Sequence, residues 1–508
     1  MTPVLSATYT AAQLGIAQIS DGVAIVVDGG TADLILCQQS VNQPKSIDLG
    51  TVSDPGTGYF ITESPPKADE WSMVQASDGM ALQIDGAEKR LFLFGASGAS
   101  GASGASGAMT MSLIASNGLP GTAQAVASSI GALSKVETFT IIPDASGDLA
   151  ALSQKGVAGL KVFEIGAGGF LTLADTLLDT PKSYIGTVSD SVSVSLDGQA
   201  YLLTLSATEN GITSFSVSDQ GQAGLIDSLG NRDGLAISGA QAIQSASVGG
   251  QTFVIIASVN SDSLSVVRVN DMGCLFQTDH VVDDLSQRIE GASALDVFEV
   301  NGRVFIVAGG SDAGLSTYEL LPGGKVSLLS SAAFETGQGL GNLASIDTAV
   351  NGDLVSIFVT EEGGTRLMVY ESDFSDLGSL LIAATSQTNG TGLDDRLIGG
   401  SGAETLAGSG GDDYLHDGAG ADRLVGGTGA DVFVFSADTS TDTIADFENG
   451  IDKIDLSDWG RIYSVSSLVI TATSTGAQIS YGGNVLTVTK AGGGGFSVSD
   501  FSDADFLF

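Results

Sequence analysis

The chain has 508 residues, of which 43% are hydrophobic and 15% charged, and its 59 acidic against 19 basic residues leave a formal net charge of −40. The length exceeds that of one ordinary domain, and the apolar fraction is too high for an acidic disordered protein. A nucleic-acid binder needs a basic footprint, anionic membranes repel such a chain, and no apolar run approaches the ~20 residues of a membrane-spanning helix, so nucleic-acid binding and membrane insertion are excluded.

The N-terminal segment shows none of the features of a secretory leader. The first basic residue is Lys45, and the apolar stretches before it are short and interrupted. A leader needs a positively charged segment followed by an apolar one. We therefore expect any export of this chain to depend on another signal.

A small turn residue followed by glycine recurs before short apolar runs along the first 350 residues. The Gly-to-Gly spacings are 64, 61, 51, 52, 52 and 50 residues, and the pairs are Asp21-Gly22, Asp85-Gly86, Ser146-Gly147, Asp197-Gly198, Gly249-Gly250, Asn301-Gly302 and Asn351-Gly352. Such pairs form hairpin turns because they accept positive φ, and strands such as 294–300 and 304–308 flank them. Two more strands follow, so each repeat of ~50 residues predicts four antiparallel strands.

Seven repeats of four antiparallel strands indicate an all-β fold, a seven-bladed β-propeller. Each blade can bury its faces only against its neighbours, and closing the ring removes exposed strand edges. A β-sandwich or a solenoid with irregular hairpins is the alternative. Over residues 10–386 the pattern resembles that of lactonase-like seven-bladed propellers, and we assign residues 1–387 to this domain.

Two cysteines do not make a disulfide framework. Cys37 belongs to the first predicted blade and Cys274 to the fifth. These blades are not neighbours in a ring of seven, whereas a disulfide needs Cα atoms within about 7 Å. We predict two free thiols that serve as buried packing residues.

Between Gly390 and Val434 the chain falls into five nonamers with an acidic residue at position six and Leu or Phe at position eight. The acidic residues are Asp395, Glu404, Asp413, Asp422 and Asp431. The repeats resemble the hemolysin-type calcium-binding nonamers of RTX proteins. This resemblance implies a parallel β-roll that binds several Ca²⁺ ions, because carboxylates and turn carbonyls supply the hard oxygen ligands that Ca²⁺ requires. Gly-rich turns without metal are the alternative.

Consecutive turns of such a roll lie on opposite sides, so turns 18 residues apart stack. One predicted stack contains Asp395, Asp413 and Asp431, and the other contains Glu404 and Asp422, with Asp442 closing it 20 residues further on. A calcium ion would lie between each pair of stacked turns. Glu404 replaces the usual Asp, so its site is expected to be the weakest.

The segment 442–457 resembles the one that follows the repeats in the C-terminal domain of serralysin-type proteases. That resemblance implies that Asp442 and Asp446 are further calcium ligands. The remainder, to Phe508, alternates like a β cap, and we assign residues 388–508 to this second domain. The protease domain itself is absent, since no His-Glu-x-x-His motif occurs.

The last four residues, 505–508, read Asp-Phe-Leu-Phe. An acidic residue followed by three apolar ones resembles the terminal motif of type I secretion substrates. Together with the repeats, it implies export by the type I secretion machinery of a Gram-negative cell. The expected location is therefore extracellular or on the cell surface, with calcium-driven folding after export.

The propeller carries no motif that assigns an activity. We favour an extracellular binding or surface module, such as an adhesin, matrix or surface-layer component that recognises a glycan or a protein; the alternative is a lactonase-like hydrolase. Loops before the inner strands contain Arg232, Asp233, Arg288 and Glu290, which we interpret as loop ion pairs, so no catalytic residue is assigned.

The chain contains only two histidines, and neither belongs to a recognisable catalytic motif. His280 lies in the propeller. His416 falls inside the third nonamer and is expected to face solvent.

Overall fold

The computed structural model describes residues 3–10, 23–28, 31–36, 45–51, 80–85, 88–93, 109–113, 124–142, 149–334, 342–361 and 366–508. The chain divides into two compact units, one of Met1–Val300 with Val304–Asp373 and one of Phe374–Phe508 with Asn301–Arg303. Among the described residues, no helix is long and apolar enough to span a membrane.

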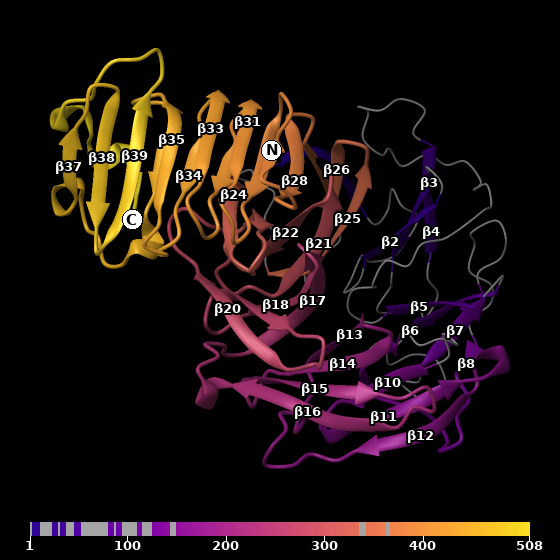
Figure 1. Cartoon of the computed structure of the whole chain (residues 1–508). Coiled ribbons are helices and arrows are strands. Elements are labelled where there is room, and N and C mark those ends of the chain that lie inside the picture. The colour runs from indigo at the N-terminus through magenta and orange to yellow at the C-terminus, as the bar shows by residue number, and fades with distance from the viewer. Residues whose placement is uncertain are drawn as a thin grey trace. The chain divides into compact units, whose positions relative to one another are not determined.

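The described part of the first unit contains seven sheets (Figure 1). The first three consist of β2 (Val23–Asp28), β3 (Thr31–Leu36) and β4 (Lys45–Thr51); β5 (Met80–Asp85), β6 (Glu88–Leu93), β7 (Thr110–Leu113) and β8 (Gln124–Ala125); and β9 (Val136–Ile142), β10 (Leu149–Gln154), β11 (Val157–Ile165) and β12 (Leu171–Leu177). The next three consist of β13 (Asp190–Leu196), β14 (Gln199–Ser206), β15 (Gly211–Val217) and β16 (Ala223–Gly230); β17 (Ala240–Val248), β18 (Gln251–Ser258), β19 (Ser263–Val269) and β20 (Leu275–Val282); and β21 (Ala294–Val300), β22 (Arg303–Gly309), β23 (Gly314–Leu320) and β24 (Val326–Ala333).

The seventh sheet joins the start of the unit to its end. It consists of β25 (Leu343–Asn351), β26 (Leu354–Glu361), β27 (Arg366–Asp373) and the N-terminal strand β1 (Val4–Thr10), which pairs antiparallel with β27. The first strands of neighbouring sheets contact one another from β5 through β9, β13, β17 and β21 to β25, and β25 also contacts β2. The seven sheets therefore follow one another in sequence order around the unit, as the predicted seven-bladed β-propeller requires.

The turn glycines act as the sequence predicts. Asp197 and Gly198, with φ of 48° and 80°, join β13 to β14, and Asn301 and Gly302, with φ of 52° and 75°, join β21 to β22. Positive φ at both central positions matches the twist of the flanking strands. Gly22, Gly86 and Gly147, which end three of the seven pairs, lie outside the described residues.

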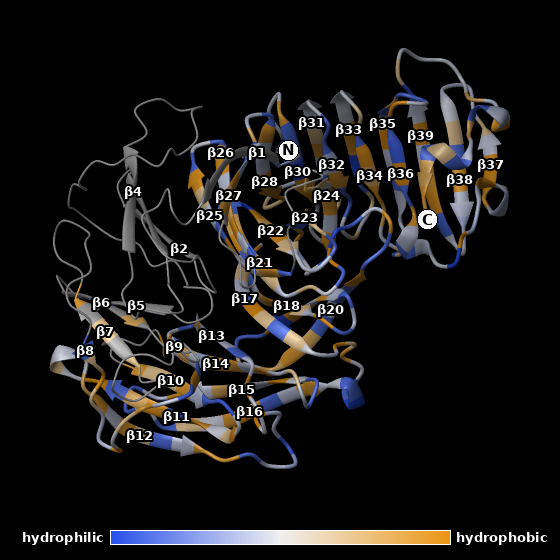
Figure 2. Cartoon of the chain, turned by 180° about the vertical axis from the view of Figure 1, so that it is seen from behind, coloured by the Kyte–Doolittle hydropathy of each residue, from blue (hydrophilic) through white to orange (hydrophobic). Residues whose placement is uncertain are grey.

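The propeller core lies between neighbouring sheets. One buried cluster combines Val162 of β11 with Leu202 of β14, and another combines Leu203 of β14 with Ile256 of β18. Figure 2 shows hydrophobic residues concentrated along the strands. Neighbouring sheets of this part of the propeller thus bury apolar side chains against one another, as their continuous apolar strands require.

The second unit contains two sheets that stack as a β-roll. One sheet has the order β28 (Leu377–Ile382), β30 (Asp394–Ile398), β32 (Tyr414–His416), β34 (Val432–Val434), β36 (Lys453–Asp455) and β40 (Phe506–Leu507). The other has the order β29 (Gln387–Asn389), β31 (Thr405–Gly410), β33 (Arg423–Thr428), β35 (Thr441–Phe447), β39 (Asn484–Lys490), β38 (Gly476–Tyr481) and β37 (Val469–Ala472). The strands pair in parallel except at β39, β38 and β37, which form an antiparallel cap.

Short 3-10 helices connect some of these strands. They are η1 (Ala167–Gly169), η2 (Asn231–Asp233), η3 (Ser457–Trp459), η4 (Val465–Ser467), η5 (Val498–Asp500) and η6 (Asp503–Asp505). β28 and β29 precede the first nonamer and pair with β30 and β31. The domain boundary between residues 387 and 388 stays a prediction.

Position eight of every nonamer points into the core of the roll, as predicted. Leu397 pairs in register with Leu415, and Leu415 pairs with Phe433. All five position-eight side chains are fully buried: Leu397, Leu406, Leu415, Leu424 and Phe433. The nonamers therefore form the parallel β-roll that the repeat predicts.

Cys274 has a free thiol. Its side chain is only half-buried, because it lies in the turn before β20 rather than in a strand. The expectation of a buried packing residue is therefore wrong for Cys274. Cys37 lies outside the described residues.

Candidate metal centre

The first stack of position-six carboxylates forms a continuous hydrogen-bonded ladder. The backbone amide of Asp395 donates to Oδ1 of Asp413 at 2.8 Å, and the amide of Asp413 donates to Oδ1 of Asp431 at 2.9 Å. The amide of Asp431 donates in turn to Oδ1 of Asp452 at 3.1 Å. All four side chains are buried. The structure thus brings Asp395, Asp413 and Asp431 together in the order that the 18-residue spacing predicts.

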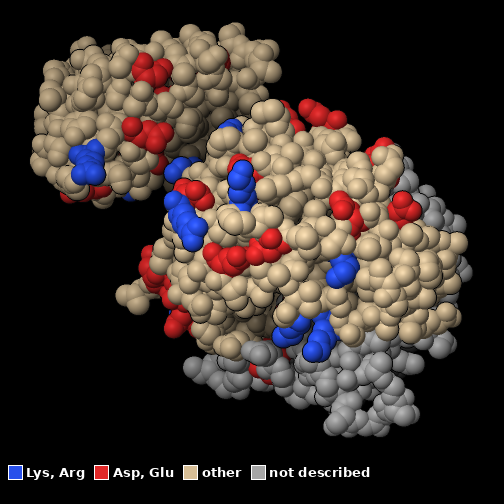
Figure 3. All heavy atoms as spheres, turned by 90° about the horizontal axis from the view of Figure 1, so that it is seen from below, with Lys and Arg blue, Asp and Glu red and all other residues tan. Residues whose placement is uncertain are grey.

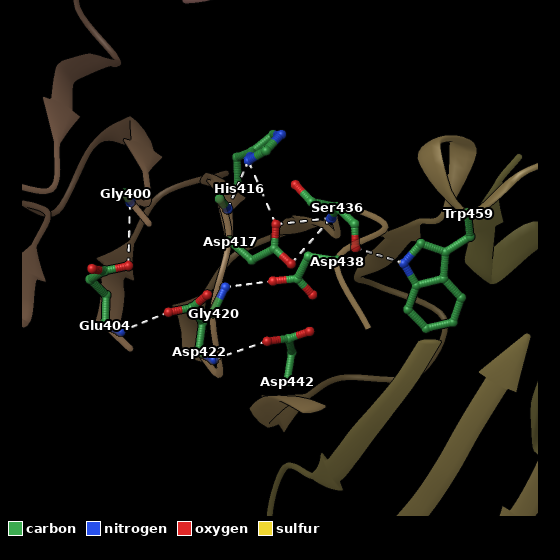
Figure 4. Close-up of polar contacts among 11 residues, drawn as sticks. Gly400, Glu404, His416, Asp417, Gly420, Asp422, Ser436, Asp438, Asp442 and Trp459 are labelled. Atoms are coloured by element: carbon green, nitrogen blue, oxygen red, sulfur yellow. Dashed lines mark hydrogen bonds and ion pairs between the residues drawn. The ribbon is translucent and has the colours of Figure 1, made fainter. Parts of the chain in front are cut away.

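The second stack forms a shorter ladder, shown in Figure 4. The amide of Glu404 donates to Oδ1 of Asp422 at 2.6 Å, and the amide of Asp422 donates to Oδ1 of Asp442 at 2.9 Å. The Glu404 carboxylate accepts hydrogen bonds within its own turn, from the amides of Gly400 and Gly402 at 3.3 Å and 3.1 Å. The longer side chain therefore curls back into its turn.

Asp446 takes a different position from the ladder residues. Its two carboxylate oxygens accept hydrogen bonds from the amides of Gly426 and Gly427, both at 3.0 Å. These glycines open the fifth nonamer. Asp446 therefore caps a Gly-rich turn and lies outside the two ladders.

Sequence reasoning missed several acidic residues that belong to these turns, among them Asp452, Asp417 and Asp438. Asp452 ends the first ladder, Asp417 accepts from the amide of Ser436 at 2.9 Å, and Asp438 accepts from the amide of Gly420 at 2.5 Å. A signal for Asp452 was present: it stands two residues before the buried Ile454, the same offset as position six before position eight. Asp417 occupies position one, where the repeat usually has glycine.

Burial disfavours the ionised form of these carboxylates and so raises their pKa values. It raises the pKa of Asp413 and of Asp431 to about 7, and nearby carboxylates raise it further against the opposing effect of the amide hydrogen bonds. Burial likewise raises the pKa of Asp422 to about 6 and that of Asp417 to about 8. Desolvation and like-charge repulsion both disfavour the ionised form. The turns therefore concentrate negative charge that the backbone amides do not compensate.

The oxygen atoms of these turns fit a hard cation. Oδ2 of Asp413 and Oδ2 of Asp422 are buried and have no hydrogen-bond partner among the described residues. A Cβ at Gly408 would lie 2.0 Å from Oδ2 of Asp413 and 2.7 Å from the carbonyl oxygen of Gly426. Carboxylate and carbonyl oxygens thus converge where only glycine leaves room, which is the donor chemistry of a calcium site.

The described residues contain no group of three or more His, Cys, Asp or Glu side chains arranged to hold one metal ion. A cation bound between these turns would therefore draw on one or two carboxylates and on backbone carbonyls. Gly-rich turns suit this arrangement because their carbonyls can approach closely.

His416 does not face solvent as expected. Its side chain is half-buried, and its Nδ1 accepts a hydrogen bond from the amide of Gly418 at 3.1 Å (Figure 4). The imidazole folds over the turn that follows β32, so burial lowers its pKa. The expectation failed because position nine lies at the end of a strand, within reach of the next turn.

Asp233, in a loop of the propeller, accepts hydrogen bonds from Gly230 and Tyr184. Its Oδ2 accepts from the amide of Gly230 at 3.2 Å and from the hydroxyl of Tyr184 at 3.3 Å. In the following blades, the backbone amide of Arg288 donates to the hydroxyl of Ser316 at 2.8 Å. These contacts fix the loops on one face of the propeller.

Comparison with known proteins identifies a family for the C-terminal part of the chain. Residues 358–482 match the family model described as Peptidase M10 serralysin C terminal. No curated protein matches the chain. Its C-terminal part is thus a serralysin C-terminal domain of the RTX type.

Two solved structures similar to the chain are the periplasmic gluconolactonase of Pseudomonas aeruginosa and a protein from Lactobacillus plantarum. The first is 16% identical, with a TM-score of 0.39, and the match covers 70% of this chain and 99% of that one. The second is 14% identical, with a TM-score of 0.40, and the match covers 58% of this chain and 84% of that one.

Proposed function

We propose that this chain is a secreted RTX protein that passes through a type I secretion machinery, folds its β-roll on extracellular Ca²⁺, and uses its propeller as a binding or surface module. The serralysin-type RTX domain implies a secreted calcium-binding protein. The observation that carries the proposal is the pair of buried carboxylate ladders, in which Asp413 and Asp422 each keep one carboxylate oxygen without a partner.

Calcium-dependent folding follows from the cost of ordering this unit. Its turns are rich in glycine, which loses more backbone entropy on folding than any other residue. Its buried aspartates lose hydration and repel one another, as their raised pKa values indicate. Bound Ca²⁺ supplies the positive charge that compensates these carboxylates, and it stabilises only the folded state.

The ladder residues prepare the turns for the ion. In each ladder Oδ1 accepts a backbone amide, which fixes the orientation of the carboxylate. Oδ2 of Asp413 is thereby left for a cation, and the Gly408 and Gly426 backbones leave the space open. Without Ca²⁺ the same segment would stay extended, which suits passage through a narrow export channel.

The C-terminal segment takes part in the folded roll. Phe506 in β40 is buried and pairs with Ile454 of β36, and its ring lies 6.0 Å from that of Phe501. Recognition of residues 505–508 by the secretion machinery would therefore precede folding. Export and folding would follow one another in a fixed order.

The charge of the chain suits an extracellular binding module that does not adhere to anionic polymers. The formal net charge is −40. On the face shown in Figure 3, Lys and Arg side chains stand among Asp and Glu side chains. A glycan or a protein is the expected ligand class, in line with an adhesin, matrix or surface-layer role.

Hydrogen–deuterium exchange of the full chain tests the calcium step. In chelator, peptides from residues 390–456 should exchange freely, while peptides from residues 190–330 stay protected. Adding Ca²⁺, but not Mg²⁺ at the same concentration, should protect residues 390–456, because Mg²⁺ demands a stricter octahedral geometry. Full protection of this segment in chelator would overturn the proposal.

A further inference from the structure

A tyrosine ring on the fourth blade, the sheet of β13–β16, lies flat on a pair of glycines. Gly211 of β15 and Gly230 of β16 pair across the two strands. A Cβ at Gly211 would lie 2.3 Å from Cγ of Tyr184, and a Cβ at Gly230 would lie 2.4 Å from Cζ of the same ring. The backbone of both strands therefore covers one face of the ring.

Hydrogen bonds hold Tyr184 at both ends. Its backbone amide donates to Oγ1 of Thr213 at 2.8 Å, and its hydroxyl donates to Oδ2 of Asp233 at 3.3 Å. Asp233 is fixed by the amide of Gly230 at 3.2 Å. The ring is thus a rigid platform, which avoids the entropy cost of ordering a side chain on binding.

Two hollows adjoin this platform. One has a volume of about 640 Å³ and is lined by Tyr184, Arg232, Glu209 and Asn231, among others. The second has a volume of about 340 Å³ and shares Tyr184 and Arg232 with the first. A ligand longer than one ring could therefore extend from one hollow to the other across the tyrosine.

The polar groups around the ring carry both signs of charge. Asp179 and Glu209 line the larger hollow together with Arg232, and Lys182 and Asp233 line the smaller one. The carboxylate of Glu209 is held in place by the amide of Gly186 at 2.6 Å. Fixed donors and acceptors on both sides of an aromatic face match a ligand with an apolar ring face and a rim of hydroxyl groups.

We propose that Tyr184 and Arg232 form a binding site for a neutral oligosaccharide, with a sugar ring stacked on Tyr184 and its hydroxyls bonded to the flanking polar groups. The assignment rests on the proposed role of the propeller as a binding module. Carboxylates beside both cations and the net charge of −40 disfavour acidic polysaccharides. An uncharged polyol can bond to carboxylates and cations at the same time.

The experiment titrates the full chain, with Ca²⁺ present, with the hexasaccharides of cellulose, laminarin, amylose and chitin, using calorimetry and saturation-transfer NMR. At least one of these should bind. Tyr184→Ala and Arg232→Ala should each weaken that binding at least about tenfold, as expected for Tyr and Arg at the centre of a site. Tyr184→Phe keeps the ring but loses the bond to Asp233, so its affinity should lie between those of the parent chain and of Tyr184→Ala. Tyr463→Ala, at a tyrosine that is 81% exposed in the other unit, is the matched control.

Two outcomes would overturn the assignment. Unchanged binding in Tyr184→Ala and Arg232→Ala would place the glycan elsewhere and leave the binding role of the propeller intact. Binding of alginate or polygalacturonate hexamers, or of a peptide, without any neutral glycan would refute the ligand class. Should Tyr184→Ala unfold on thermal denaturation, Arg232→Ala decides alone, since Arg232 is exposed. Calcium-dependent protection of residues 390–456 is measured separately, so the two proposals can fail independently.

Discussion

The backbone amide of Asp413 donates a hydrogen bond to the carboxylate of Asp431, 18 residues further along the chain, at 2.9 Å. The carboxylate of Asp413 accepts in the same way from the amide of Asp395. Asp413 therefore holds the turn before it through its carboxylate and is held by the turn after it through its amide. Loss of one carboxylate should affect two neighbouring turns.

Alanine substitutions at the ladder positions should raise the calcium midpoint for folding by different amounts. Asp413→Ala should raise the calcium midpoint for folding most, followed by Asp422→Ala and then Glu404→Ala, because Asp413 lies in the middle of the longer ladder and the Glu404 carboxylate accepts from amides of its own turn. Calcium titrations followed by circular dichroism measure the midpoints. Asp219→Ala, at an exposed propeller position, is the control. A larger shift for Glu404→Ala than for Asp413→Ala would contradict the two-ladder arrangement.

Asp413→Asn should separate charge from hydrogen bonding. An amide oxygen can still accept from the amide of Asp395, but the buried negative charge is gone. In chelator the variant should therefore retain more roll structure by circular dichroism than the parent chain, because burial disfavours the ionised carboxylate. With Ca²⁺ the order should reverse, since an oxygen ligand and its charge are lost. The same sign of change under both conditions would show that Asp413 has no role in cation binding.

Much of the roll could be predicted because its contacts join residues that lie a short, constant distance apart in the sequence. The nonamer keeps position six at a constant spacing, so the positions of Asp413 and Asp431 in one ladder follow from arithmetic. The spacing then changes to 20 residues before Asp442 and 21 before Asp452, and the second of these was missed. The turn insertions break the period, while the offset from carboxylate to buried apolar residue survives.

Non-local features could not be predicted in the same way. The pairing of β1 with β27 joins segments more than 350 residues apart, and no local pattern encodes such a pairing. The ring of Tyr184 packs on two glycines from different strands, and these glycines are 19 residues apart in the sequence. Hydrophobic periodicity identifies strands, but it does not identify what covers an aromatic ring.

Acid should replace calcium in stabilising the roll. Burial raises the pKa of Asp413 and Asp431 to about 7 and that of Asp417 to about 8 in the folded state, whereas an unfolded aspartate titrates near about 3.9. The folded state therefore binds more protons than the unfolded state between these values. In chelator, stability should be highest below about pH 4 and should be lost as the pH rises through about 7 to 8.

Circular dichroism of the full chain in chelator, from pH 4 to pH 8.5, measures this dependence. Because protons compete with Ca²⁺ for the same carboxylates, the stability that added Ca²⁺ gives to the roll should shrink as the pH falls. A roll that loses stability on acidification in chelator would contradict the raised pKa values.

Two glycine substitutions in neighbouring turns should differ sharply. Gly408→Ala places a Cβ about 2.0 Å from Oδ2 of Asp413, so that the carboxylate must move. Gly392→Ala is the matched control, because a Cβ there meets nothing within 4 Å and neither glycine has a positive φ. Overpacking of this kind costs roughly 1–3 kcal/mol. With Ca²⁺ present, Gly408→Ala should therefore lower the unfolding temperature of the roll and raise its calcium midpoint, while Gly392→Ala should leave both close to those of the parent chain. Equal effects of the two substitutions would mean that the space over Gly408 is not reserved for Asp413 and its cation.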